Sequence, residues 1–198
     1  MKPTETRNKI LWNLPNLLTA FRIVLVPVFL VMVIQKKVLG SFTVFLLAGL
    51  TDVLDGFIAR TWHLKTKFGT LLDPAADKLL LTTAFILMTI PALSIPNFIP
   101  LWLTIAVIGR DVVIGLGFFI ILLVRGQKDF SPTILGKVST VCQVGTVLLV
   151  LLFNYLQTSP SLLSPFYSIT LAATLLSGIH YAYIGFMMLF FPKKVRST

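Results

Sequence analysis

The chain has 198 residues, of which 56% are hydrophobic and only 12% are charged, and its formal net charge is +10. This balance is unlike that of a soluble globular protein and predicts an integral membrane protein of the all-α class. The basic residues lie between long apolar runs, so we expect them to contact anionic membrane lipids and not nucleic acid. The length fits a single domain, 1–198, and the single cysteine, Cys142, excludes a disulfide within one chain.

The N-terminal residues 1–14 combine three basic side chains with an apolar run that includes Trp12. Basic residues with a tryptophan at headgroup depth are typical of a helix on the membrane surface. We therefore predict an N-terminal surface helix that does not cross the membrane.

Six apolar runs follow, each close to the twenty or so residues that a transmembrane helix needs. Proline and glycine occur in several of the links between them, where they favour helix ends. The predicted spans are 17–34, 38–59, 71–90, 98–124, 138–156 and 163–191.

Lysine and arginine are unevenly distributed over the predicted loops. Twelve of them fall in the N-terminal segment, the second-to-third link, the fourth-to-fifth link (which we take to include Lys137) and the C-terminal tail, whereas only Lys36 and Lys37 fall on the other side. Positive charge marks the cytoplasmic side of a membrane protein. We therefore expect a multi-pass protein with both termini in the cytoplasm.

Four of the seven acidic residues lie between Thr51 and Lys78. Asp52 and Asp55 are three residues apart and Asp73 and Asp77 four, so on helices each pair projects from one face. Gathered carboxylates repel one another unless protons or metal ions neutralise them. All-oxygen ligands favour Mg²⁺ or Mn²⁺, which also bind phosphate oxygens. The alternative is a solvated loop with scattered acids.

Small and basic residues complete the pattern around these acids. The pattern consists of eight residues: Asp52, Asp55, Gly56, Ala59, Arg60, Gly69, Asp73 and Asp77. This pattern resembles the signature of the CDP-alcohol phosphotransferases, which are integral membrane enzymes of phospholipid synthesis. The resemblance extends to Pro15–Thr19 with Arg22, to Arg110-Asp111 and to Gly136-Lys137. The distribution of lysine and arginine places the four-aspartate site, like the termini, on the cytoplasmic side.

The resemblance implies a role for each aspartate. Asp52, Asp55 and Asp73 would hold two divalent ions bridged by the diphosphate of CDP-diacylglycerol. Asp77 would lie beside the metals and act as the general base for the acceptor hydroxyl, although it could also be a fourth metal ligand without a proton role. A homodimer is implied as well.

The nucleotide site is implied by the same pattern. Gly56, Ala59 and Gly69 would make room for cytidine and ribose, and Arg60 would neutralise diphosphate charge. The small residues could instead serve tight helix packing, which is common in membranes.

An acceptor pocket is predicted from ionisable residues in or beside apolar spans, which are functional candidates by default. We assign Arg110, Lys137 and Arg22 to it, with Asp111 in support. Arg22 could instead extend to the bilayer surface. Because neighbouring residues do not face each other on a helix, we expect no direct salt bridge between Arg110 and Asp111.

The acceptor alcohol is the least constrained part of the prediction. The chain resembles the branch of the family that makes phosphatidylglycerophosphate and cardiolipin, in part through the segment Leu176–Tyr181. Phosphatidylglycerophosphate synthases resemble one another in carrying a second arginine two turns after the first, suited to glycerol 3-phosphate. Here Gly115-Leu116-Gly117-Phe118 follows Arg110-Asp111, which favours phosphatidylglycerol as acceptor and cardiolipin as product.

Glycerol 3-phosphate remains the alternative acceptor, since Lys137 or Arg22 could replace the missing arginine. Two other classes of membrane protein also use clustered aspartates. Prenyltransferases also set aspartates around magnesium and a diphosphate, but lack the Gly56, Ala59 and Arg60 pattern. A divalent cation transporter would use intramembrane carboxylates near the midplane, whereas these acids lie near one membrane face.

Overall fold

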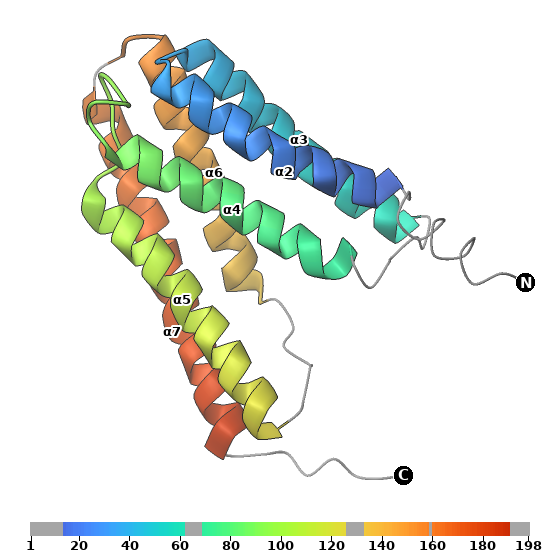
Figure 1. Cartoon of the computed structure of the whole chain (residues 1–198). Coiled ribbons are helices and arrows are strands. Elements are labelled where there is room, and N and C mark those ends of the chain that lie inside the picture. The colour runs from blue at the N-terminus through green and yellow to red at the C-terminus, as the bar shows by residue number, and fades with distance from the viewer. Residues whose placement is uncertain (1–13, 62–68, 126–132, 159, 191–198) are drawn as a thin grey trace, which may run out of the picture. The chain divides into compact units, whose positions relative to one another are not determined.

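The computed structural model describes the backbone of residues 14–61, 69–125, 133–158 and 160–190, and side chains from Ala20 onward except within 53–77 and at 125 and 190. Within these residues all regular secondary structure is helical (Figure 1). The helices are α2 (Leu14–Ile34), α3 (Val38–Thr61), α4 (Gly69–Thr89), α5 (Leu101–Arg125), α6 (Ile134–Tyr155), the short 3-10 helix η1 (Pro160–Leu163) and α7 (Ser164–Phe190). The all-α prediction is confirmed, while residues 1–13 of the predicted surface helix lie outside the description.

Three segments in the described part of the chain are long and apolar enough to cross a membrane: Leu101–Val124, Ile134–Tyr155 and Pro160–Leu189. The other three helices contain shorter apolar stretches when only described residues are counted: Ala20–Ile34, Val38–Asp52 and Lys78–Thr89. Large apolar side chains on α5, such as Leu116 and Leu123, are more than half exposed. Such a surface suits lipid and not water, because a soluble monomer rarely exposes a continuous apolar face.

The chain divides into two compact units, and α6 contributes to both. The first unit comprises the described residues up to Phe98 together with Val147–Pro160. In it, α2 packs against both α3 and α4. The rings of Phe29 on α2 and Phe45 on α3 lie 5.6 Å apart between centroids at an angle of 49°. Both rings are buried, as are Ala48 and Phe85, so aromatic and small residues together form the core of this unit.

The segment between α4 and α5 is fixed by a buried asparagine on the last turns of α6. Asn154 Oδ1 accepts the backbone N–H of Asn97 at 2.7 Å, and its Nδ2 donates to the hydroxyl of Ser94 at 3.0 Å and to the carbonyl of Asn97 at 2.9 Å. All three residues are buried. A buried loop must satisfy its backbone polar groups within the protein, and Asn154 does so here.

The second unit comprises the described residues of Ile99–Thr146 and those from Ser161 onward. Helices α5 and α7 pack along each other. A line of buried polar side chains joins α6 to α7: Gln143 Nε2 donates to the hydroxyls of Ser139 and Thr174, and the hydroxyls of Thr146 and Thr170 lie 2.7 Å apart. In a lipid environment such hydrogen bonds hold helices together where a hydrophobic driving force is weak.

Helix α6 begins four residues before the predicted boundary. Thr133 precedes it, and the Thr133 hydroxyl accepts the backbone N–H of Gly136 at 3.1 Å. This is an N-cap, which satisfies one of the orphan donors of the first turn. The assignment of Lys137 to the preceding link is therefore wrong, because Lys137 lies in the first turn of the helix.

Candidate active site

The four aspartates of the signature lie on two consecutive helices of the first unit. Asp52 and Asp55 are in the last turns of α3, and Asp73 and Asp77 are in the first turns of α4. Figure 1 shows the end of α3 and the beginning of α4 at the same end of this unit. The prediction that each pair of aspartates lies on a helix is thus confirmed. Side chains outside the description are those of Asp55, Gly56, Ala59, Arg60, Gly69, Asp73 and Asp77, so their roles stay predictions.

Asp52 is the signature aspartate whose side chain is described, and it forms an ion pair with Arg22 of α2. The distance from Arg22 Nη1 to Asp52 Oδ1 is 3.1 Å. Arg22 is fully buried, whereas the Asp52 side chain is 44% exposed. A buried guanidinium needs an anionic partner, and Asp52 supplies one. The alternative in which Arg22 extends to the bilayer surface is therefore wrong.

The donor chemistry of Asp52 fits a divalent metal. Its carboxylate remains partly accessible beside Arg22, and carboxylate oxygen is a ligand that Mg²⁺ and Mn²⁺ prefer. Among the described side chains there is no group of three or more potential metal ligands, but three of the four aspartates are not among them. The two-ion site therefore stays a prediction for the cluster as a whole.

Arg110 of α5 is held by all three helices of the second unit. Its Nε and Nη2 donate to the hydroxyl of Ser177 on α7 at 3.2 and 2.9 Å, and Nη2 also reaches the carbonyl of Gly136 on α6 at 3.5 Å. Its guanidinium lies 5.7 Å from the ring centroid of Tyr181 on α7. The Arg110 side chain is 10% exposed, so these contacts replace water around the cation.

Arg110 also forms a direct salt bridge with its neighbour Asp111, which corrects the prediction that none would form. Nη1 of Arg110 lies 2.7 Å from Oδ1 of Asp111. The helix directs the two Cα–Cβ bonds apart, but the guanidinium stands on a long, flexible stem and can turn back toward the neighbouring carboxylate. The hydrogen bonds to Ser177 hold it in that position.

Tyr181 connects Arg110 to the start of α6. Its hydroxyl accepts the backbone N–H of Thr133 at 2.9 Å, and it lies so close to Gly136 that a Cβ there would be 2.7 Å from that hydroxyl. The ring is 8% exposed. Ser177 and Tyr181 belong to the segment Leu176–Tyr181, which contributes to the family resemblance. The sequence alone indicates no role for either residue, because their partners lie on other helices.

Two of the three predicted acceptor residues are brought to adjoining positions. The guanidinium of Arg110 contacts the carbonyl of Gly136, and Lys137 is the next residue on α6 and is exposed. Lys137 lies near the positive end of the α6 dipole, so this end of the second unit favours an anion. The third predicted acceptor residue, Arg22, belongs to the first unit, where it forms the ion pair with Asp52.

Comparison with known proteins identifies the class. The sequence model of the CDP-alcohol phosphatidyltransferase family matches residues 12–188. The chain is 39% identical over 132 residues to a cardiolipin synthase (CMP-forming) of Rattus norvegicus, covering 66% of this chain and 41% of that protein. It is 34% identical over 190 residues to the cardiolipin synthase (CMP-forming) of Homo sapiens, covering 86% of this chain and 62% of that protein.

A bacterial relative carries a different name. The chain is 32% identical over 139 residues to the CDP-diacylglycerol–glycerol-3-phosphate 3-phosphatidyltransferase of Escherichia coli strain K12, covering 67% of this chain and 73% of that protein.

This protein belongs to the CDP-alcohol phosphatidyltransferase family. The predicted family and enzyme class are thereby confirmed over the transporter and prenyltransferase interpretations. With its three long apolar segments, the chain is a membrane protein. It spans between 41% and 62% of the length of the rat and human relatives.

Proposed function

We propose that this protein transfers a phosphatidyl group from CDP-diacylglycerol to phosphatidylglycerol, forming cardiolipin and releasing CMP. The observation that carries the proposal is the family match over residues 12–188, within which the aspartate signature falls at the end of α3 and the beginning of α4. The names of the rat and human relatives favour this reaction over others in the family.

The aspartates supply the reactive centre in this proposal. Asp52, Asp55 and Asp73 would hold two divalent ions, Mg²⁺ or Mn²⁺, with Asp77 beside them; when bound, these ions polarise the diphosphate and stabilise the charge on the leaving CMP. Asp77 accepts the proton of the acceptor hydroxyl. The hydroxyl oxygen then forms a bond to the phosphorus that carries diacylglycerol, and the bond from this phosphorus to the oxygen of CMP breaks. No covalent intermediate with the protein is required.

The nucleotide lies, in this proposal, against the small residues of α3 and α4. Gly56, Ala59 and Gly69 leave space for cytidine and ribose, and Arg60 offsets diphosphate charge. Arg22 binds Asp52, so it orients a metal ligand and leaves acceptor binding to Arg110 and Lys137.

The choice of phosphatidylglycerol as acceptor is supported by the hydrogen bonds that Arg110 already makes within the protein. A guanidinium has five N–H donors, and four hydrogen bonds to Ser177, Asp111 and Gly136 already engage four of them. One donor together with exposed Lys137 suits a singly charged phosphodiester. Exposed apolar side chains further along α5, such as Val113 and Leu116, suit an acceptor that carries acyl chains.

A second candidate acceptor is glycerol 3-phosphate. It is favoured by the Escherichia coli relative, of which the chain covers 73%. The two are separated by incubating purified protein with CDP-diacylglycerol and Mg²⁺, offering phosphatidylglycerol or glycerol 3-phosphate alone, and identifying products by mass spectrometry. We expect cardiolipin and CMP with phosphatidylglycerol. Phosphatidylglycerophosphate without cardiolipin would reverse the choice, and no CMP with either acceptor would refute the proposal.

We propose further that all six long helices cross the membrane as one domain, with the aspartate site and both termini in the cytoplasm. The support is the distribution of twelve lysines and arginines against two. Labelling of single cysteines introduced at Lys36 and at Lys193, in a Cys142→Ser background, tests it in intact cells. Labelling at Lys36 but not Lys193 by an impermeant reagent is expected, and the opposite pattern refutes the orientation.

A homodimer is proposed from the family resemblance alone. Cross-linking in native membranes should give a dimer, and monomer alone would contradict it.

A further inference from the structure

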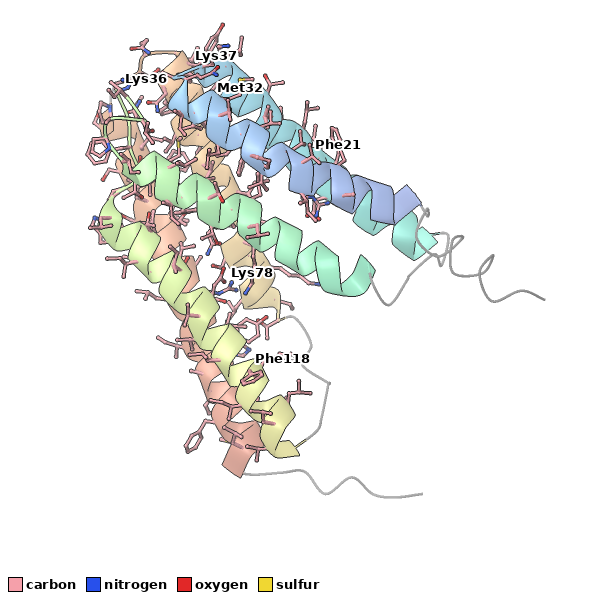
Figure 2. All side chains as sticks on the ribbon, in the orientation of Figure 1. Phe21, Met32, Lys36, Lys37, Lys78 and Phe118 are labelled. Atoms are coloured by element: carbon pink, nitrogen blue, oxygen red, sulfur yellow. The ribbon has the colours of Figure 1, made fainter. Side chains whose placement is uncertain are left out.

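A pocket of about 390 Å³ lies in the first unit at the turn between α2 and α3. It is lined by Lys36, Lys37, Val38, Leu39, Gly40, Asn154, Tyr155 and Gln157. Figure 2 shows Lys36 and Lys37 together at this turn, at the far end of α2 from Phe21. Asp52 is fourteen residues along α3 from Val38, which is about 21 Å at the helical rise of about 1.5 Å per residue. The pocket is therefore distinct from the aspartate site.

The described lining residues make the pocket cationic at one side and apolar at the other. They include two exposed lysines and no acid. Leu39 is 53% exposed and Tyr155 is 51% exposed, so an apolar side chain and an aromatic ring line the same opening. The amide group of Asn154 is engaged by Asn97 and Ser94. The polar groups left to meet a ligand are chiefly the two ammonium groups and the hydroxyl of Tyr155.

Lys36 and Lys37 occupy two backbone positions, one after the end of α2 and one before the start of α3, at which residues other than lysine are preferred. Lys36 lies two residues after the end of α2 and has φ 56°, and Lys37 N–H donates to the carbonyl of Met32 at 2.9 Å. This is the left-handed C-terminal position that glycine fills most easily. Lys37 is the N-cap of α3, since its carbonyl accepts the N–H of Ser41 at 2.9 Å. Serine, threonine, aspartate or asparagine is favoured there, and a cation opposes the helix dipole.

A residue just after the end of α6 that also lines the pocket has a positive φ as well. Gln157 lies two residues after the end of α6 and has φ 53°, and with Lys36 it is one of two non-glycine residues with positive φ in the described chain. Both line this pocket. Backbone strain of this kind gathers at sites that bind ligands. The side chains of Lys36 and Gln157 are thus held at the opening in spite of a conformational preference for glycine.

We infer that this pocket binds the phosphate group of an anionic phospholipid, with Lys36 and Lys37 contacting the phosphate and Leu39 and Tyr155 contacting the upper part of an acyl chain. Cations next to an apolar wall and an aromatic side chain are the combination that a headgroup and its first methylenes require. α3 has 24 residues, about 36 Å of helix, which is long enough to cross the hydrocarbon core, so the pocket at its start and the end of the helix that carries Asp52 and Asp55 lie toward opposite membrane surfaces. In the topology proposed above, on which this placement rests, the bound lipid belongs to the leaflet remote from the reaction.

The test uses phosphatidic acid carrying a photoreactive group in its acyl chain, since this lipid has no headgroup hydroxyl and cannot act as an acceptor. The purified protein is titrated with it in neutral detergent, bound lipid is counted by native mass spectrometry, and labelled peptides are mapped after irradiation. We expect labelling of the peptides that hold Leu39 and Tyr155. Phosphatidylcholine should label them weakly, and an excess of inorganic phosphate should not displace the lipid.

Three variants sharpen the test. Lys36→Gln with Lys37→Gln should weaken this binding by roughly 30-fold, because each lysine near an anionic lipid contributes about a fivefold gain in affinity. Lys193→Gln with Lys194→Gln removes the same charge from the tail and should leave labelling at the pocket unchanged. Lys36→Arg with Lys37→Arg keeps both positive charges at the same opening and should retain most of the binding.

Equal labelling in the wild type and the Lys36→Gln/Lys37→Gln variant would overturn the inference. So would equal loss in both glutamine double variants, or displacement by inorganic phosphate at the same concentration as the lipid, which would indicate a general anion site.

Discussion

Replacing Gly136 by alanine tests the arrangement at the start of α6. The added Cβ would lie 2.7 Å from the hydroxyl of Tyr181 and 3.0 Å from its Cε2. The hydroxyl would have to move to at least 3.4 Å, the lower limit of ordinary contact. It cannot do so without lengthening its hydrogen bond from the Thr133 N–H and shifting the ring beneath Arg110. The substitution therefore disturbs three helices at once.

The expected loss of stability follows from three terms. Overpacking costs about 1–3 kcal/mol, a weakened hydrogen bond costs about 1 kcal/mol, and alanine regains up to about 1 kcal/mol of helix propensity. The net loss is about 1–3 kcal/mol, or about 2–4 °C of melting temperature for each kcal/mol in a domain of this size. Thermal unfolding in detergent measures it.

A matched control lies on the same helix. Gly145 has no atom within 4 Å of an added Cβ, so Gly145→Ala should be neutral or slightly stabilising. Tyr181→Phe removes the closest atom, and the double variant Gly136→Ala/Tyr181→Phe should lose less stability than the two single losses together, by about 1 kcal/mol. If Gly136→Ala proves as stable as Gly145→Ala, or if the double variant is strictly additive, the close contact does not constrain α6.

The other predictions concern the aspartate site and the loop before α5. Asp77→Asn should stop CMP release while leaving CDP-diacylglycerol binding largely intact, whereas Asp52→Asn should abolish turnover and weaken metal dependence; equal loss of CDP-lipid affinity in both, measured by a binding titration, would refute separate roles. Asn154→Leu removes three buried hydrogen bonds and should cost about 2–4 kcal/mol in thermal unfolding. Thr43→Ala removes one exposed hydroxyl bond within α3 and serves as its control; similar melting temperatures for the two variants would show that the Asn154 bonds do not stabilise the loop.

The helices could be predicted because their signal is local. About twenty consecutive apolar residues determine a helix whatever surrounds them, and every predicted span overlaps an observed helix. The start of α6 was missed because Thr133 acts through a single capping bond, which an apolar-run criterion does not detect. The aspartate pairs were found because a spacing of three or four residues has meaning within one helix.

Contacts between helices could not be predicted in the same way. Asn154 meets Asn97 across 57 residues, and Ser177 meets Arg110 across 67. Neither pair leaves a periodic trace in the sequence. The expectation for Arg110 and Asp111 failed for a related reason: the spacing rule describes where side chains begin, whereas the position of a guanidinium depends on what binds its far end.

The contacts of Arg110 bear on the choice of acceptor, and Ser177 is where they can be changed. Bidentate recognition of a dianionic phosphate needs two parallel N–H groups on one edge of the guanidinium. The edge formed by Nε and Nη2 is occupied by the Ser177 hydroxyl, and Nη1 is bound to Asp111. Ser177→Ala would free the first edge. We expect the ratio of phosphatidylglycerophosphate to cardiolipin formed from mixed acceptors to rise about tenfold or more, since one hydrogen bond to a charged group contributes about 1.5–3 kcal/mol. Ser177→Thr keeps the hydroxyl and should keep the wild-type ratio. An unchanged ratio in Ser177→Ala, in protein of normal melting temperature, would show that Arg110 does not discriminate between the two acceptors.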